Sequence, residues 1–245
     1  MKIILVKDYE EMSYLGSLRI AKEILENPNA VLGLATGSSP LGIYRRLIEM
    51  YKNEILDFSK ITTINLDEYV GLNQQHQQSY RWFMNNYLFN HINIDINNTY
   101  LPNGMAKDLE EEGINYDQQI EQLGGIDLQL LGIGTNGHIA FNEPAPELLV
   151  GTHVAKLSKS TIEANSRFFN NIEEVPTTAL TMGLGQIMRA KQVLLIASGE
   201  QKAKALGGLL SGKITTENPA TMLQLHRDET VIADEEAYKL VKKRG

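Results

Sequence analysis

The sequence predicts an α/β fold built on a doubly wound, mostly parallel sheet with helices on both faces. Short apolar runs alternate along the whole chain with longer segments whose apolar residues recur at helical spacing. Glycine-rich or polar segments follow several of the apolar runs, which is typical of parallel strands that turn into helices. No repeat or long linker interrupts this alternation. We therefore expect a single domain over residues 1–245, with the irregular segment after Glu143 as a candidate flap.

The expected elements follow these patterns in chain order. The first helix, residues 9–26, has apolar residues at helical spacing and ends at an Asn-Pro-Asn turn, and Pro40 is well placed at the start of a second helix, 41–51. Residues 79–91 form an aromatic helix, and we expect most of its rings to lie in the core. Residues 108–123 form an acidic helix with a solvated face. The remaining helices are expected at 161–169, from 198 onward and at 235–241, and the strands at 3–6, 30–35, 61–66, 128–133, 152–157, 179–182, 192–197 and 230–233.

Composition excludes several classes of function. The chain has 245 residues and a formal net charge of −7, so it has no basic surplus to hold a nucleic-acid backbone. It contains no cysteine, which excludes disulfides, thiolate nucleophiles and thiolate metal sites. The apolar run at the N-terminus is too short for a secretory signal, and no stretch is long enough to cross a membrane, so we expect a cytoplasmic protein. An anionic substrate would need local positive charge, because the overall field repels it.

One stretch, from Ile126 to Pro144, combines a buried strand with polar residues: I-D-L-Q-L-L-G-I-G-T-N-G-H-I-A-F-N-E-P. Ligands bind at the carboxyl ends of strands in such sheets, and here Asn136, His138 and Glu143 follow the strand. His138, oriented by Glu143, is a candidate general acid/base; the alternative is a loop histidine with a structural hydrogen bond. The glycines also spell G-x-G-x-x-G, but Asn136 and Pro144 argue against the long helix that a dinucleotide site needs.

The loop T-G-S-S-P, residues 36–40, joins a strand to a helix. Its glycine allows close approach of the backbone to a ligand, its serines offer hydroxyl groups, and the first N–H groups of the following helix favour an anion. A phosphate site and an ordinary helix cap explain the loop equally well. Arg167 and Lys202 are candidate phosphate partners, although each alone is more often a surface cation.

Two adjacent carboxylates, Asp67 and Glu68, end another strand in the sequence L-D-E-Y. Because side chains alternate along a strand, one carboxylate can face a ligand while the other is structural. A carboxylate at this edge of the sheet can take a proton from a carbon next to a carbonyl or imine, and a solvated loop acid or a helix cap is the alternative. The sequence has neither an H-E-x-x-H motif nor a close histidine pair, so we expect no metal site.

Five segments occur in the order and at the spacing of a known family: L-G-L-A-T-G-S-S-P, N-L-D-E-Y-V-G-L, L-L-G-I-G-T-N-G-H-I-A-F-N-E-P, A-N-S-R-F-F and V-P-T-T-A-L-T-M-G. On these motifs the chain closely resembles the glucosamine-6-phosphate deaminase family over essentially its whole length. The resemblance implies a Rossmann-like sheet. The phosphate loop alone would be shared with 6-phosphogluconolactonases, which resemble the same architecture.

The resemblance implies an enzyme of amino sugar catabolism that converts glucosamine 6-phosphate and water to fructose 6-phosphate and ammonia, with no metal or organic cofactor. It implies that Asp67 transfers a proton between C2 and C1, and that His138, with Asn136 and Glu143, opens the sugar ring. The substrate- and phosphate-binding positions that it implies are Thr36, Gly37, Ser38, Ser39, Tyr80, Arg167 and Lys202. We expect a monomer or small homo-oligomer whose partner is a small sugar phosphate. The alternatives are a lactonase that hydrolyses 6-phosphogluconolactone and a non-catalytic sugar-phosphate sensor.

The chain departs from the family pattern in two places. Some members carry a carboxylate where this chain has Asn136. An amide can orient the imidazole but cannot stabilise an imidazolium by charge, so we expect Glu143 to carry more of that role than in those members. Glu143→Gln should then shift the pH–rate profile more than Asn136→Ala. Allosteric relatives have a basic cluster after the N-E-P motif and a C-terminal extension. This chain has His153 and Ala155 at the cluster, with Lys156 as a weak substitute, and it ends at Gly245. We therefore expect hyperbolic kinetics without activation by N-acetylglucosamine 6-phosphate.

Overall fold

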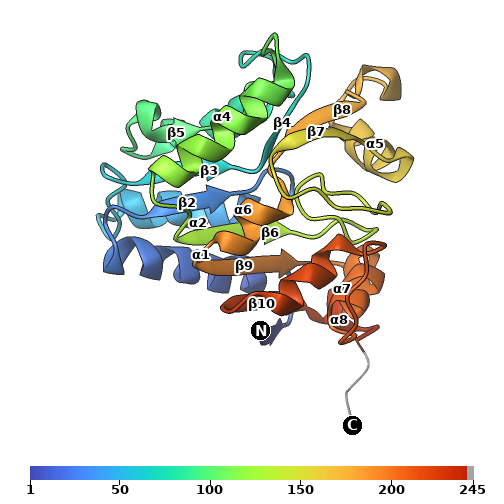
Figure 1. Ribbon diagram of the computed structural model, residues 1–245. Helices are drawn as coiled ribbons and strands as arrows, with labels where there is room; N and C mark the ends of the chain where they lie inside the picture. Colours follow the sequence, from blue (N-terminus) through green and yellow to red (C-terminus); the bar gives the residue numbers. More distant parts are fainter. Residues whose placement is uncertain (242–245) are drawn as a thin grey trace.

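The computed structural model describes residues 1–241, and Figure 1 shows how they are arranged around two sheets. In the larger sheet, which has seven strands, the neighbouring strands pair in parallel. This arrangement confirms the predicted doubly wound, mostly parallel α/β fold. In order across the sheet, the strands are β1 (Lys2–Val6), β10 (Glu229–Asp234), β9 (Gln192–Ala197), β6 (Leu128–Gly132), β2 (Val31–Leu34), β3 (Thr62–Asn65) and β5 (Thr99–Tyr100).

Helices cover both faces of this sheet (Figure 1). On one face, α1 (Tyr9–Glu26) and α2 (Leu41–Lys52) pack against each other, and α4 (Leu109–Gln122) and α6 (Leu184–Arg189) lie on the other. Local sequence defines where α1 begins, because the Asp8 side chain accepts a hydrogen bond from a backbone N–H of its first turn. The remaining helices are α3 (Tyr80–Tyr87), α5 (Lys159–Asn165), α7 (Ala203–Leu209) and α8 (Glu235–Tyr238).

The order of the strands places a ligand site. From β2 the chain proceeds through β3 to β5 on one side of the sheet, whereas from β6 it proceeds through β9 to β10 on the other. Neighbouring strands β2 and β6 therefore flank the switch point of the sheet, and in doubly wound folds ligands bind outside the carboxyl ends of such strands. The loop after β2 and the glycine-rich segment after β6 both lie at this edge.

The smaller sheet was not predicted. It has three antiparallel strands in the order β4 (Asp67–Tyr69), β8 (Thr178–Thr181) and β7 (His153–Lys156). The chain leaves the large sheet at Leu66, whose carbonyl oxygen accepts a hydrogen bond from the backbone N–H of Met182 at 2.7 Å. Because β4 continues almost directly from β3, its alternating pattern looks like the end of the same strand. Asp67 thus belongs to the small sheet but still lies beside the carboxyl edge of the large one.

Several helix boundaries differ from those expected. The helix that begins at Glu235 ends at Tyr238, and the helix predicted from residue 198 begins with a 3₁₀ turn, Glu200–Lys202, before α7. The aromatic segment divides into α3 and a 3₁₀ turn, Phe89–His91. Patterning missed α6 and β5, which are too short for their apolar pattern to repeat.

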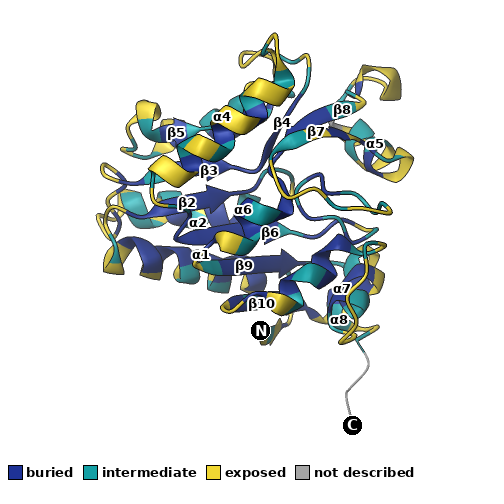
Figure 2. Cartoon of the chain, in the orientation of Figure 1, coloured by how far each residue is buried: buried dark blue, intermediate teal, exposed yellow. Residues whose placement is uncertain are grey.

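The core follows the large sheet, whose central strands are buried (Figure 2). Of the five aromatic rings at residues 79–91, only that of Phe89 is buried, and Tyr87 is 43% exposed. Phe83 packs against the main core and Tyr80 against a smaller apolar cluster, and both also line a cleft. Three of the five rings thus pack in or against the core, as expected for most of them, although only one is buried. Within residues 1–241, no helix is long and apolar enough to cross a membrane.

Candidate active site

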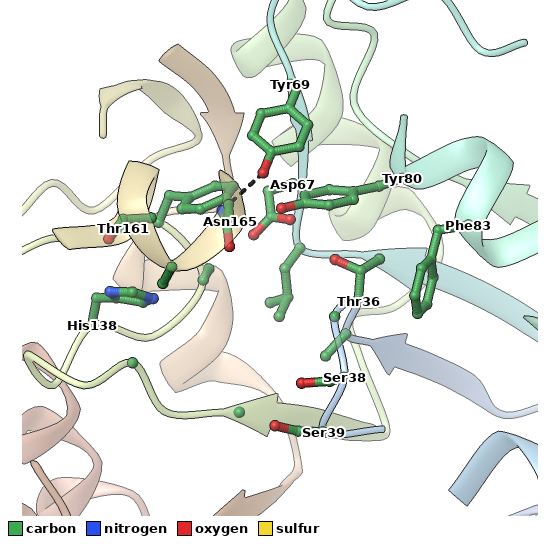
Figure 3. Close-up of a pocket in the computed structure, with 18 of the residues that line it drawn as sticks. Thr36, Ser38, Ser39, Asp67, Tyr69, Tyr80, Phe83, His138, Thr161 and Asn165 are labelled. Carbon is green, nitrogen blue, oxygen red and sulfur yellow. Dashed lines mark hydrogen bonds between the residues drawn. The ribbon is translucent and has the colours of Figure 1, made fainter. Parts of the chain in front are cut away.

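A cleft opens outside the carboxyl ends of β2 and β6, and it brings the predicted segments together (Figure 3). Asn136 and Glu143 contact His138 through the Nδ1 side of its ring. Of the predicted site residues, the lining of the cleft includes Thr36, Gly37, Ser38, Ser39, Asp67, Tyr80, His138, Arg167 and Lys202.

One end of the cleft is polar and cationic. The side chains of Ser38 and Ser39 do not cap α2, whose N-cap residue, Pro40, makes no capping hydrogen bond. The helix-cap interpretation of this loop is therefore wrong. Arg167 reaches the loop and donates a hydrogen bond from Nη2 to Oγ of Ser38 at 3.1 Å. Burial and the nearby charge of Arg167 lower the pKa of Lys202 to about 8, so a bound anion would stabilise both cations.

Asp67 and Glu68 point in different directions, as strand alternation predicts. Glu68 accepts hydrogen bonds at 2.9 Å from the backbone N–H groups of Tyr69, Tyr80 and Arg81, and so holds the start of α3. Asp67 instead lines the cleft and is 6% exposed. Burial, together with the negative charge of Glu68, raises the pKa of Asp67 to about 8. A carboxyl group poised near neutral pH in a cleft is suited to proton transfer.

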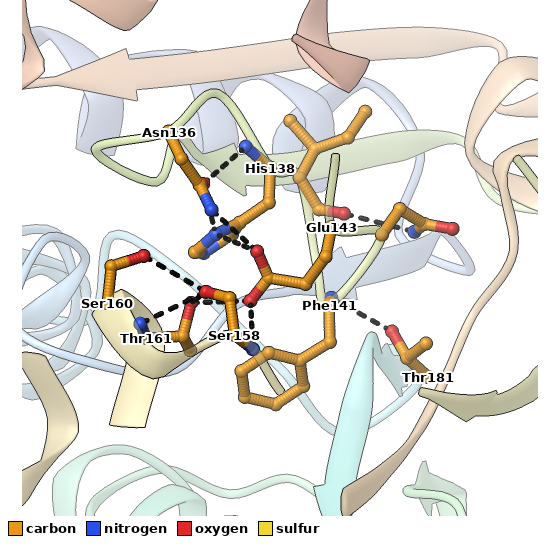
Figure 4. Close-up of polar contacts among 10 residues, drawn as sticks. Asn136, His138, Phe141, Glu143, Ser158, Ser160, Thr161 and Thr181 are labelled. Atoms are coloured by element: carbon orange, nitrogen blue, oxygen red, sulfur yellow. Dashed lines mark hydrogen bonds and ion pairs between the residues drawn. The ribbon is translucent and has the colours of Figure 1, made fainter. Parts of the chain in front are cut away.

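The imidazole of His138 is held by a relay of two side chains (Figure 4). Its Nδ1 lies 2.8 Å from Oδ1 of Asn136, and Nδ2 of Asn136 donates to Oε2 of Glu143 at 2.6 Å. The direct distance from Nδ1 to Oε2 of Glu143 is longer, 3.5 Å. Glu143 thus acts on His138 both directly and through the Asn136 amide, and the bridge from Asn136 to Glu143 is the part that the sequence did not indicate.

This relay determines which ring nitrogen carries the proton. An ionised Glu143 only accepts hydrogen bonds, so Asn136 must turn its NH₂ group toward Glu143 and its oxygen toward His138. Nδ1 of His138 is then the donor, and Nε2 of the neutral ring has no proton. Burial tends to raise the pKa of Glu143, but the hydrogen bond and charge of His138 and the hydrogen bonds from Thr161 and Asn136 lower it to about 2.

The glycines after β6 serve packing and turn geometry. A Cβ atom at Gly134 would lie 2.3 Å from Nδ1 of His138, so only glycine leaves room for the imidazole. Gly137 has a φ of +89° and packs against Asn218. The segment 133–152 contains no helix, which removes the structural basis of a dinucleotide fingerprint.

Sequence reasoning missed several residues of the cleft. Tyr69, Phe141 and Phe169 form an aromatic wall with Tyr80, and the rings of Tyr69 and Tyr80 are 4.8 Å apart. Asn165 donates a hydrogen bond to the Tyr69 hydroxyl at 2.8 Å. The only sequence signal for Asn165 was its place in the A-N-S-R-F-F motif. Across residues 1–241, no cluster of three or more His, Asp or Glu side chains could hold a metal ion.

Comparison with known proteins shows to which family the chain belongs. The family model for glucosamine-6-phosphate isomerases and 6-phosphogluconolactonase matches residues 16–232. The chain belongs to this family. A family member named glucosamine-6-phosphate deaminase, from Clostridium perfringens (strain 13 / Type A), is 60% identical over 242 residues, which cover 99% of this chain and 100% of that protein. A deaminase from Thermoanaerobacter sp. (strain X514) is 55% identical over 241 residues, which cover 98% and 95%.

Solved structures of the family share the fold. A monomeric glucosamine-6-phosphate deaminase matches with a TM-score of 0.96 and 47% identity, over 98% of this chain and 100% of that chain. The 6-phosphogluconolactonase from Trypanosoma brucei matches with a TM-score of 0.78 and 18% identity, over 98% of each chain. The lactonase likeness shows the fold alone, whereas the deaminases are similar in sequence as well.

Proposed function

We propose that the chain is a glucosamine-6-phosphate deaminase, which converts glucosamine 6-phosphate and water to fructose 6-phosphate and ammonia. The observation that carries the proposal is Asp67, a buried carboxyl group with a pKa near 8 that shares a cleft with the His138 relay. High identity to deaminases over nearly the full chain supports the same reaction.

Binding begins at the cationic end of the cleft. The phosphate group lies on the loop at Gly37, Ser38 and Ser39 and is held by Arg167 and Lys202. It is remote from the reacting carbons, so its binding energy orients the sugar for the chemical steps. This local charge overcomes the repulsion that a protein of net charge −7 exerts on a dianion.

Ring opening requires a base that becomes an acid. Nε2 of His138 takes the proton from the anomeric hydroxyl group and returns it to the ring oxygen as the C1–O5 bond breaks. The tautomer that Asn136 imposes leaves Nε2 ready to accept this proton. Glu143, whose pKa of about 2 keeps it ionised at neutral pH, stabilises the transient imidazolium.

Deamination then proceeds through proton transfer between neighbouring carbons. Ionised Asp67 takes the proton from C2 of the open-chain sugar, and a proton passes from the C2 ammonium group to the aldehyde oxygen O1. Asp67 then returns its proton at C1, which leaves a hydroxyl group on C1 and an iminium group at C2. Water adds to C2 and passes a proton to the nitrogen; ammonia then leaves as the C2–N bond breaks, while the added oxygen releases its remaining proton and becomes the C2 carbonyl group. Asp67 serves as base and then acid, and a transfer of this kind contributes about 10²- to 10⁴-fold in rate.

The lactonase alternative needs a phosphate site and a base but no proton abstraction at C2. Asp67 would therefore matter less to a lactonase, whereas the deaminase reaction uses both its position and its raised pKa. A sugar-phosphate sensor would not need the His138 relay either.

The test is ammonia release from glucosamine 6-phosphate by the purified protein, with Asp67→Asn alongside. We expect the wild type to release ammonia and the variant to release almost none. Release by both would retain the reaction but remove Asp67 from it. Absence of release by folded wild type, with hydrolysis of 6-phosphogluconolactone or with binding alone, would establish the lactonase or the sensor instead.

A further inference from the structure

A short segment, residues 158–169, contacts three parts of the cleft at once. Thr161 contacts Glu143 of the His138 relay. Asn165 contacts Tyr69, which follows Asp67 by two residues. Arg167 contacts Ser38 of the phosphate loop. The segment consists of α5 and a 3₁₀ turn, Ser166–Phe168, so these contacts are joined by continuous helical backbone.

The contact of Thr161 with Glu143 is built into a hydroxyl network (Figure 4). The Thr161 hydroxyl group is the donor to Oε1 of Glu143, and the residue is only 4% exposed. Oγ of Ser158 lies 2.9 Å from Oγ1 of Thr161 and accepts a hydrogen bond from the Thr161 backbone N–H. The backbone N–H of Ser158 also donates to Oε1 at 3.4 Å.

The two oxygens of Glu143 therefore have different tasks. Oε2 accepts from Asn136 and so orients the amide that holds His138. Oε1 is held by Thr161 on α5. A carboxylate held at one oxygen only can rotate about its terminal bond, because that torsion is broad. Without the Thr161 hydroxyl group, Oε1 would keep only the long hydrogen bond from the Ser158 backbone N–H, so Thr161 helps to keep Oε2 in line with Asn136.

We propose that Thr161 is a positioning residue for Glu143, and that its segment transmits phosphate binding at Arg167 to the His138 relay. The inference rests on the proposed deaminase function. A phosphate that draws Arg167 toward the loop at Ser38 holds α5 in place, and α5 then holds Glu143. A sugar without phosphate would leave the relay less ordered, which would link substrate recognition to ring opening.

The experiment compares Thr161→Val, which removes the hydroxyl group and keeps the shape, with Thr161→Ser, which keeps the hydroxyl group. Thr152→Val is the matched control, because the Thr152 hydroxyl donates to Oδ1 of Asp117 at 2.6 Å, away from the cleft lining. Ammonia release is measured against substrate concentration and pH for each variant. Circular dichroism and melting curves verify that each variant is folded.

We expect Thr161→Val to lower kcat about 10- to 100-fold, since it removes a hydrogen bond to a charged group, with a smaller change in KM. A fall in kcat that exceeds the change in KM and is rescued by Thr161→Ser indicates a positioning role, whereas a purely structural defect would not be rescued by the retained hydroxyl group. Thr161→Ser should restore most of the rate, and Thr152→Val should keep the wild-type kcat. A folded Thr161→Val protein with wild-type kcat and pH profile would overturn the proposal.

A second pair of variants tests the transmission itself. In the background of Arg167→Met, Thr161→Val should lower kcat by less than about threefold, because α5 is no longer held by the phosphate. Full additivity of the two effects would overturn the link between Arg167 and Thr161. The wild type separates this inference from the proposed function: no ammonia release by wild type overturns both, whereas normal release with an unaffected Thr161→Val overturns the inference alone.

Discussion

Two carboxyl groups in the same site, the buried Asp67 and the partly buried Glu143, have opposite surroundings. Asp67 lies against the aromatic wall, next to the negative charge of Glu68, and its pKa is raised to about 8. Glu143 accepts hydrogen bonds from Asn136 and Thr161 and lies close to His138, and its pKa is lowered to about 2. Both are largely removed from water, so burial alone does not decide whether a carboxyl group is charged.

The difference teaches how one site can contain both a proton carrier and a permanent charge. A buried carboxylate surrounded by donors stays ionised across the working pH range, whereas one beside a second carboxylate holds its proton until near pH 8. We propose that Asp67 moves protons and that Glu143 supplies fixed charge. Substitutions at the two carboxyl groups separate these roles, and we expect the largest effect at Asp67.

The first prediction is that Asp67→Asn lowers kcat by about 10²- to 10⁴-fold, because the amide cannot carry a proton between C2 and C1.

The same variant should be more stable than the wild type at pH 8. The folded pKa of Asp67, about 8, exceeds its ordinary value of 3.8, so wild-type stability falls as the pH rises between these values and the unfolded chain ionises first. We expect the variant to gain roughly 2 kcal/mol or more at pH 8, and to lose that advantage near pH 4. Denaturant unfolding at both pH values measures it, and equal stability at pH 8 would contradict the buried, protonated state.

The second prediction concerns the other carboxylate. Glu143→Gln should lower kcat about 10- to 100-fold and change the pH–rate profile, because it removes the fixed charge and lets the Asn136 amide reverse. Asn136→Ala is the control and should have a smaller effect, since Oε2 of Glu143 already lies 3.5 Å from Nδ1 of His138. Small, equal effects of the two substitutions would show that the relay does not act on the imidazole.

The third prediction changes the environment of Asp67 without touching it. If Asp67 must be ionised in the free enzyme, kcat/KM rises with pH through a pKa of about 8. Glu68→Gln removes the neighbouring negative charge and should move this limb downward by up to about one pH unit. Because Glu68 also holds the start of α3, melting curves are needed beside the kinetics. An unchanged limb in a folded variant would assign it to another group.

The smallest effect is expected from N-acetylglucosamine 6-phosphate, the sugar phosphate that activates allosteric relatives. In β7, His153 and Ala155 stand where allosteric relatives have basic residues. We therefore expect the curve of rate against substrate concentration to be hyperbolic. Addition of N-acetylglucosamine 6-phosphate should leave kcat unchanged and act, if at all, as competition. A sigmoidal curve that this sugar phosphate makes hyperbolic would refute the expectation.

Much of this architecture is readable from the sequence because local rules apply to it. Alternation along a strand correctly separated Asp67 from Glu68, and the first helix covers the predicted residues and ends at the Asn-Pro-Asn turn. The loop at residues 36–40 was singled out because a glycine, serines and a helix start are adjacent in the chain, and it lines the cleft. Each of these signals depends on near neighbours only.

The features that escaped prediction depend on contacts between distant segments. The small sheet pairs β4 with β8, and nothing in the three residues of β4 distinguishes this partner from the large sheet. The role of Asn136 as a bridge arises from its distances to Glu143 and His138, not from its spacing in the chain. Thr161 gives no sequence signal either, because a threonine in a short helix is unremarkable until its hydroxyl group is seen on Glu143.

The most direct test of the central claim is a carboxyl ¹³C NMR titration of protein labelled at aspartate, with Asp67 assigned by the signal that Asp67→Asn removes. We expect this signal to titrate with a midpoint near pH 8, and the midpoint to fall to a lower pH in Glu68→Gln. A signal that titrates near the ordinary pKa of an aspartate, about 4, would contradict it, because Asp67 and Glu143 would then both be ionised at neutral pH.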